Sequence, residues 1–181
     1  MTTRTPTLPP DLRPDCSACC GLCCVAPAFD AAQGFGFDKP AHTPCVNLQS
    51  DYRCAIHDNL SVNGFPGCIV FDCHGAGQRV TRQVFHGVSW SDSPHIAVKM
   101  FNAFGRFCVL HELMALLSIA RQRFVEENIQ TRLKTSLYEI EALCQEESVS
   151  PGSVDIAGIK RTTMNMLRGL ESTAAAAALK L

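Results

Sequence analysis

The sequence lacks the features that would place it among membrane, exported or nucleic-acid-binding proteins. Its longest uncharged apolar stretch, Leu113 to Ala120, is far below the roughly 20 residues that cross a bilayer, and residues 1–10 carry no apolar run of the secretory type. Charged residues make up only 18% of the chain and the formal net charge is −1, which excludes a charge-rich disordered chain and a basic nucleic-acid binder. We therefore expect a cytoplasmic globular protein with no membrane and no nucleic-acid partner.

Some residue types are almost missing from one half of the chain. All eight glutamates lie at or after Glu112, whereas nine of the ten prolines and eight of the nine aspartates lie at or before Pro94. Asp and Pro favour turns and Glu favours helix interiors, so the first half should be rich in loops and the second half helical. We predict a flexible N-terminal segment (1–15), a cysteine-rich metal- or cluster-binding region (16–93) and a helical region (94–181) packed on it.

Apolar periodicity predicts about three helices in the second half. Ser93 and Pro94 suit the N-cap and first position of a helix over about 94–120. Two more helices are expected at about 124–146 and from Val154 toward Leu181, separated by a break at 150–153. In the first half, the apolar run 68–71 and residues 80–84 suggest short strands between turns. The predicted fold class is α-rich: a loop-dominated, cysteine-rich half followed by a bundle of about three helices.

Eleven cysteines are the feature present in excess, and nine of them lie in the first 73 residues. Five form the motif CxxCCxxCC, in which thiols three residues apart can bind one ion and vicinal thiols make poor disulfides. In a reducing compartment, clustered thiols in odd number favour metal binding over disulfides. The candidate metal ligands are Cys16, Cys19, Cys20, Cys23, Cys24, Cys45, Cys54, Cys68 and Cys73.

The donor set restricts the metal. Soft thiolates select zinc, copper(I) or iron–sulfur clusters, and His42, His57 and His74 lie near cysteines in the sequence. A zinc site needs four ligands and a four-iron cluster usually needs four thiolates, so nine cysteines could supply one site or two. Five clustered thiols exceed what one zinc ion uses, so an iron–sulfur cluster is slightly favoured over one to two zinc or iron ions.

The cysteine pattern resembles the YkgJ-type zinc- or iron-chelating domain. The residues that carry this resemblance are Cys16, Cys20, Cys23 and Cys24, with Cys19 as the alternative to Cys20, followed by Pro44-Cys45, Arg53-Cys54 and Gly67-Cys68. A longer stretch, about 16–145, resembles the N-terminal module of actinobacterial pentapeptide-repeat proteins, on motifs from Gly36-Phe37-Asp38-Lys39-Pro40 through Asp72-Cys73 to His111-Glu112-Leu113. The repeats themselves are absent here. The resemblance implies metal or cluster binding and names no reaction.

Other functions have weaker support. An iron-dependent enzyme that modifies a protein or small metabolite is the alternative, because a flagellin lysine methylase has a similar cysteine cluster, but no nucleotide or methyl-donor motif accompanies it here. A metallothionein-like buffer is disfavoured because the helical half has a core pattern. A protein partner or a second copy of the chain would bind through the helices.

Two further residue types in the helical half are predicted to be structural. His111-Glu112 begins like the zinc-protease motif HExxH, but Ala115 stands where the second His is needed. His111 is therefore expected on the inner face of its helix, hydrogen-bonded to a neighbour. Cys108 and Cys144 lie on apolar helix faces and are left out of the site.

Removing the metal should melt the first half of the chain. That half has few large apolar side chains, and structural zinc contributes about 10–16 kcal/mol in finger peptides, comparable to the stability of a whole domain. A strong chelator, or Cys23→Ser with Cys24→Ser, should abolish protection of residues 16–93 in hydrogen exchange. Full retention of structure in metal-free protein would contradict this prediction.

Overall fold

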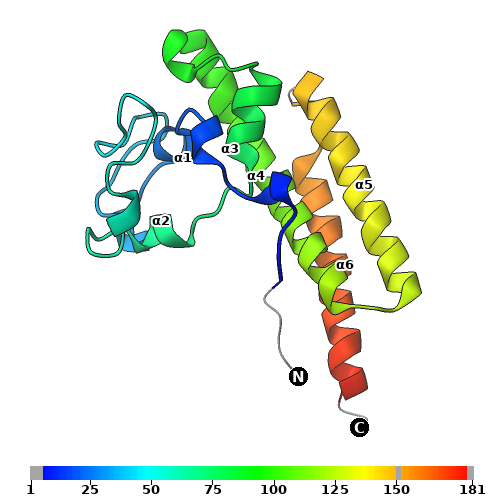
Figure 1. Cartoon of the computed structure of the whole chain (residues 1–181). Coiled ribbons are helices and arrows are strands. Elements are labelled where there is room, and N and C mark those ends of the chain that lie inside the picture. The colour runs from blue at the N-terminus through cyan, green and yellow to red at the C-terminus, as the bar shows by residue number, and fades with distance from the viewer. Residues whose placement is uncertain (1–5, 150–151, 179–181) are drawn as a thin grey trace.

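The computed structural model describes residues 6–149 and 152–178, and its regular elements are helical (Figure 1). Within these residues no strand forms, and the only β-type pairings are the isolated bridges Phe29–Lys39 and Leu48–Cys54. The predicted α-rich fold, with a loop-dominated cysteine-rich half before a helical bundle, is confirmed.

The first half contains only short elements. They are the 3₁₀ turns η1 (Pro10–Leu12), η2 (Cys16–Ala18), η3 (Ala31–Gln33), η4 (His57–Asn59) and η6 (Trp90–Asp92), the π-helical turn η5 (Val80–Val84), and the helices α1 (Leu22–Val25), α2 (Pro66–Val70) and α3 (Ala76–Arg79).

Both predicted strands are wrong. The run 68–71 lies largely in α2, where Pro66 occupies the first turn and favours a helical start. Residues 80–84 continue α3 as η5, and Val80 is fully buried against the core. Helical continuation from α3 and packing of Val80 override the β-propensity of these side chains.

Three long helices make up the second half: α4 (Pro94–Arg123), α5 (Glu127–Val149) and α6 (Ile156–Ala178). The Ser93 side chain accepts a hydrogen bond from the Ile96 N–H (3.2 Å) and Pro94 follows it, which confirms the predicted start of α4. Helices α4 and α5 each end three residues beyond their predicted ends. Residues 150, 151 and 179–181 of the predicted helical region lie outside the described residues.

Helix α4 lies between the loop-rich half and the α5–α6 pair (Figure 1). One continuous apolar cluster joins these parts. Its fully buried members include Leu22, Val25, Ala76, Val80, Met100, Phe107, Leu110, Leu113, Leu117 and Leu133. The cysteine loops are therefore built directly onto one side of a packed helix.

Helix α4 is long and apolar enough to cross a membrane by length and composition. However, 61% of its most apolar window is buried inside the protein. A core helix gives the same signal, so this observation is weak evidence for a membrane span.

The described part of the predicted N-terminal segment lies along the far end of α4. The Thr7 backbone exchanges two hydrogen bonds with the Gln122 side chain (3.1 and 3.0 Å), and Leu12 is buried in the core. Residues 1–5 lie outside the described residues.

A buried carboxylate joins α5 to α4. Glu147 is fully buried, and it accepts hydrogen bonds from Arg106 Nη2 (3.0 Å), from Arg106 Nε and from the Gly152 N–H (2.7 Å). Burial alone would raise the pKa of this carboxyl, but the bonds from Arg106 and Gly152 hold it below its usual value of 4.5.

Replacing Glu147 by Ala should lower the free energy of unfolding by about 2–3 kcal/mol, because Arg106 and the Gly152 N–H lose their acceptor. Urea denaturation at pH 7 measures this, and Glu146→Ala at the exposed neighbour should change stability by less than about 0.5 kcal/mol.

The stabilisation by Glu147 should also depend on pH. Because the pKa of Glu147 is lowered on folding, its contribution is present above the unfolded pKa and is lost as the pH falls through the folded pKa. The difference between wild type and E147A should therefore shrink below about pH 4. A constant difference down to about pH 3 would contradict the ion pair.

Candidate metal centre

All nine predicted ligands lie in the described residues, and each is a free thiol. They come from separate parts of the loop-rich half: η2 carries Cys16, α1 carries Cys23 and Cys24, α2 carries Cys68, and the others lie in loops. Any common site therefore has to be assembled by tertiary contacts between these segments.

The loop that carries the five clustered cysteines is held against a second loop by Gly21. Gly21 has a φ of 70° and precedes α1. A Cβ at this position would lie 2.7 Å from Leu48 Cδ1 and 2.9 Å from the carbonyl oxygen of Tyr52, closer than real Cβ contacts allow. Only glycine combines this backbone conformation with this approach, so CxxCCGxCC is tied to the 48–54 turn.

The structure separates the two cysteines that the sequence left as alternatives. Cys20 is buried, and its sulfur lies 3.4 Å from Thr81 Oγ1 and 3.5 Å from Met100 Sδ, within the core. The Cys19 sulfur instead lies against Gly77 of α3, where an added Cβ would approach it to 2.7 Å. Cys20 is thus a packing residue and Cys19 is the better ligand candidate.

The Cys23 thiol lies beside Cys24 and acts electrostatically on thiols of several other segments. Its Sγ is 3.9 Å from Cys24 Sγ, and the hydrogen bond between them, together with burial, raises the pKa of Cys23. Burial also raises the pKa of five further thiols, and the charge of Cys23 adds to each shift: Cys16, Cys19, Cys54, Cys68 and Cys73. The pKa reaches about 12 at Cys19 and about 11 at Cys68. These thiols stay neutral unless a positive charge, such as a metal ion, offsets their repulsion.

Backbone N–H groups from residues two to four places further along the chain point at four of the sulfurs. Leu22 and Gly21 act in this way on Cys19, Asn47 on Cys45, Ile56 on Cys54, and Gly77 and Gly75 on Cys73; the bonds from Leu22 and Gly77 are the larger ones and come from three and four places further along. The Asn47 nitrogen lies 3.5 Å from Cys45 Sγ. Such bonds favour the charged thiolate, and at iron–sulfur clusters they adjust the reduction potential. Four separate turns therefore share a feature suited to metal ligation.

Strained backbone accompanies three of these loops. His42, Tyr52 and His74 have φ values of 64°, 64° and 47°, and each lies within three residues of Cys45, Cys54 or Cys73. A non-glycine residue in this region costs about 1–3 kcal/mol and persists only where its surroundings impose it. Three of the four non-glycine residues with positive φ in the described part of the chain are therefore near candidate ligands, and the fourth is His86 (φ 53°).

The gathered thiols do not form a finished coordination sphere. Among the described residues, no group of three or more His, Cys, Asp or Glu side chains is arranged so that it could hold a metal ion. The nearby histidines do not complete one: the His57 side chain is 68% exposed and lies beside Asp58, and His74 Nδ1 is 3.5 Å from Asp72 Oδ1. The soft donor set fits zinc or an iron–sulfur cluster, but the loops would have to close around it.

Cys108 is a residue near the cluster that the sequence interpretation set aside. It lies on α4 and is only partly buried; burial raises its pKa, and the charges of Cys73, Cys23 and Cys19 add to the shift. Helical periodicity places Cys108 and His111 on one face, but it does not say that this face meets the thiols. Cys144, by contrast, is fully buried in the core as predicted.

The prediction for His111 is confirmed. It is 1% exposed, and its Nδ1 lies 2.7 Å from the carbonyl oxygen of His74. Burial lowers its pKa to about 4, so the imidazole is neutral at pH 7. His111 thereby fixes the loop after Cys73 onto α4.

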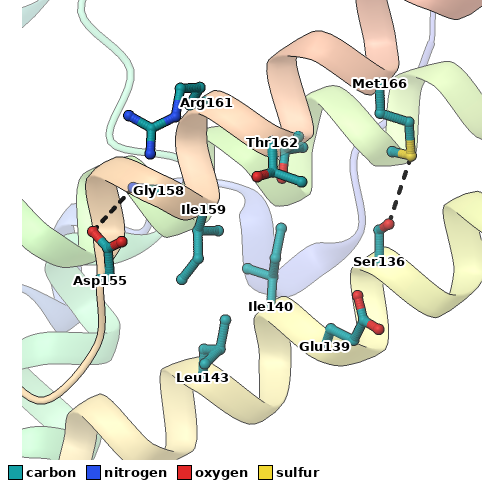
Figure 2. Close-up of a pocket in the computed structure, with 11 residues that line it drawn as sticks. Ser136, Glu139, Ile140, Leu143, Asp155, Gly158, Ile159, Arg161, Thr162 and Met166 are labelled. Atoms are coloured by element: carbon teal, nitrogen blue, oxygen red, sulfur yellow. Dashed lines mark hydrogen bonds between the residues drawn. The ribbon is translucent and has the colours of Figure 1, made fainter.

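The described clefts lie away from the cysteines. A cleft of about 470 Å³ lies between α5 and α6. Ile140, Leu143 and Ile159 line one part of it, and the Ser136 hydroxyl, 3.8 Å from Met166 Sδ, lies at another (Figure 2). A second cleft lies between α4 and the start of α6. Neither is lined by a cysteine, so neither extends the thiol cluster.

Gly77→Ala should displace Cys19. The new Cβ would meet the Cys19 sulfur at 2.7 Å, so we expect a loss of about 1–3 kcal/mol in urea denaturation and a lower metal content after anaerobic purification. Gly105→Ala in α4 is the matched control, because its Cβ would meet nothing within 4 Å and should stabilise by up to about 1 kcal/mol. Equal stability and equal metal content in the two variants would show that contact with Gly77 does not fix the position of the Cys19 sulfur.

Part of the chain is similar in sequence to a known bacterial protein. A stretch of 119 residues, 66% of this chain, is 42% identical to the uncharacterized protein YybG of Bacillus subtilis (strain 168). The match covers 43% of that protein, so the chain spans less than half the length of the relative. No family model and no solved structure matches the chain. The comparison establishes a relationship to YybG over most of this chain and assigns no activity.

Proposed function

We propose that this chain is a metal-binding protein that holds an iron–sulfur cluster, or one to two zinc or iron ions, through its clustered cysteines. The observation that supports the proposal is the electrostatic coupling of Cys23 to free thiols of separate segments, together with backbone N–H groups directed at the sulfurs of Cys19, Cys45, Cys54 and Cys73. The spacing of the same cysteines, which resembles that of YkgJ-type domains, is in agreement with the proposal.

A bound metal ion would stabilise this arrangement in two ways. Buried thiols that repel one another as thiolates require a positive charge, and a metal ion supplies it. The loops that carry them hold strained residues and only short helical elements, so a cross-link between loops would stabilise them. A disulfide framework could do the same, but all eleven cysteines are free thiols.

The iron–sulfur cluster is slightly favoured over isolated ions. The number of thiols exceeds one zinc site, and N–H···S bonds such as those at Cys19 and Cys73 adjust the reduction potential of clusters. Such a centre would supply either a structural cross-link, electron transfer or metal transfer, with α4 as its support. The enzyme alternative gains no specific support, because the described clefts contain no cysteine.

Metal analysis after anaerobic purification tests the proposal. An iron–sulfur cluster should give a brown protein that absorbs at about 400 nm and contains iron with acid-labile sulfide. Zinc should instead give a colourless protein with a whole number of zinc ions per chain. Cys144→Ala, which removes a thiol of the core, should bind as much metal as wild type. Wild-type protein with neither iron nor zinc, even after reconstitution, would refute metal binding.

A further inference from the structure

We propose that the cleft between α5 and α6 is a self-association surface that takes a second copy of this chain, related to the first by a two-fold axis. The surface belongs to the helical half and contains none of the candidate metal ligands. Helix packing leaves the apolar cleft open, and two unpaired charges of opposite sign lie at its edges.

The arrangement of the long helices explains why the cleft is open. Helices α5 and α6 each pack mainly on α4, and within the described residues they approach each other closely at few points. One such point, where the Ser136 hydroxyl lies 3.8 Å from Met166 Sδ, borders one end of the cleft (Figure 2). The cleft is lined by α5, α6 and Asp155, the residue before α6, and by no residue of α4, so α4 does not fill it.

Apolar side chains lie in the cleft with part of their surface uncovered. Ile140 is buried, but Leu143, Ile159 and Met166 are only half-buried. Most of the lining residues of each helix recur at three- or four-residue spacing, so each helix contributes one stripe. Helices bury such stripes against other elements, so the exposed parts of these three side chains indicate that a further helical layer covers the cleft.

The charged side chains at the edges have no partner in the described part of the chain. Glu139 of α5 and Arg161 of α6 line opposite sides of the cleft and are exposed (Figure 2). Neither side chain forms a hydrogen bond or an ion pair there, so the two do not pair across the cleft. The third charged lining residue, Asp155, is engaged, because its Oδ1 accepts a hydrogen bond from the Gly158 N–H (3.0 Å) at the start of α6.

The two edge charges lie at nearly the same level of the helix pair. Helices α5 and α6 run in opposite directions (Figure 1). Counted from the contact between Ser136 and Met166, Glu139 is three residues along α5 and Arg161 is five residues back along α6. Their levels therefore differ by about two residues, or about 3 Å along the axis.

This charge pattern is complementary to itself. A two-fold axis that runs along the cleft places α5 of each copy over α6 of the other, and in such an interface every contact occurs twice. Because the levels match, Glu139 of each copy then faces Arg161 of the other, which gives two ion pairs around an apolar centre. A strongly acidic or strongly basic partner would meet one like charge, so the surface favours a second copy of this chain.

Sedimentation equilibrium of the full-length chain in the presence of a thiol reductant tests the interface. Wild type should form a dimer. Glu139→Arg and Arg161→Glu each place like charges opposite one another at two symmetry-related points, so each should raise the dimer dissociation constant by about tenfold or more. The double variant E139R/R161E restores opposite charges and should return to within about threefold of wild type.

Lys134→Glu is the matched control. Lys134 is an exposed charge of α5 that does not line the cleft, so its reversal should leave the dissociation constant unchanged. All the substituted side chains are exposed, and helix content from circular dichroism confirms that each variant is folded.

Three results would overturn the proposed dimer. Wild type that is monomeric at every concentration would leave the cleft to another partner. Single reversals that leave the dimer intact, or a double variant that is no tighter than the singles, would place the contact elsewhere. A Lys134→Glu variant as weak as the other two would reduce the effect to net charge. None of these results bears on metal content, which is measured separately.

Discussion

The burial of clustered thiols is the constraint on which the loop-rich half depends. The candidate ligands come from segments that have almost no regular secondary structure, and burial raises the pKa of Cys16, Cys19 and Cys73 among them. A metal ion bound by these thiols, as proposed above, would couple the charge state of the sulfurs to the stability of the loops.

Helix α4 supplies the rigid side of this arrangement. Its buried face receives the apolar residues of α1 and α3, the two short helices next to the cysteine motif and the Cys73 loop. Cys20 and His111 tie those loops down through a sulfur contact with Met100 and a hydrogen bond to His74. Helices α5 and α6 cover the other side and add the buried Glu147–Arg106 pair. The helical half thus positions the thiols without contributing one of the nine.

Cys108 is a residue whose sequence position suggests a core role but whose surroundings in the folded protein include the clustered thiols. An isolated thiol on an apolar helix face is ordinarily a packing residue. Here that part of α4 borders the cluster, where Cys73, Cys23 and Cys19 act on it. Its partial burial and the electrostatic effect of these thiols distinguish it from Cys144, although the two have similar sequence neighbourhoods.

Local patterns in the sequence determined the three long helices, the Ser93 cap, the buried position of His111 and the set of nine cysteines, because periodicity, capping and residue chemistry act over a few residues. Only the tertiary structure decided that 68–71 and 80–84 are helical, that Cys20 rather than Cys19 enters the core, and that Cys108 faces the thiols. These outcomes depend on which side of a loop meets α4. Contacts between residues far apart in the chain fix that choice, and spacing within a motif does not encode it.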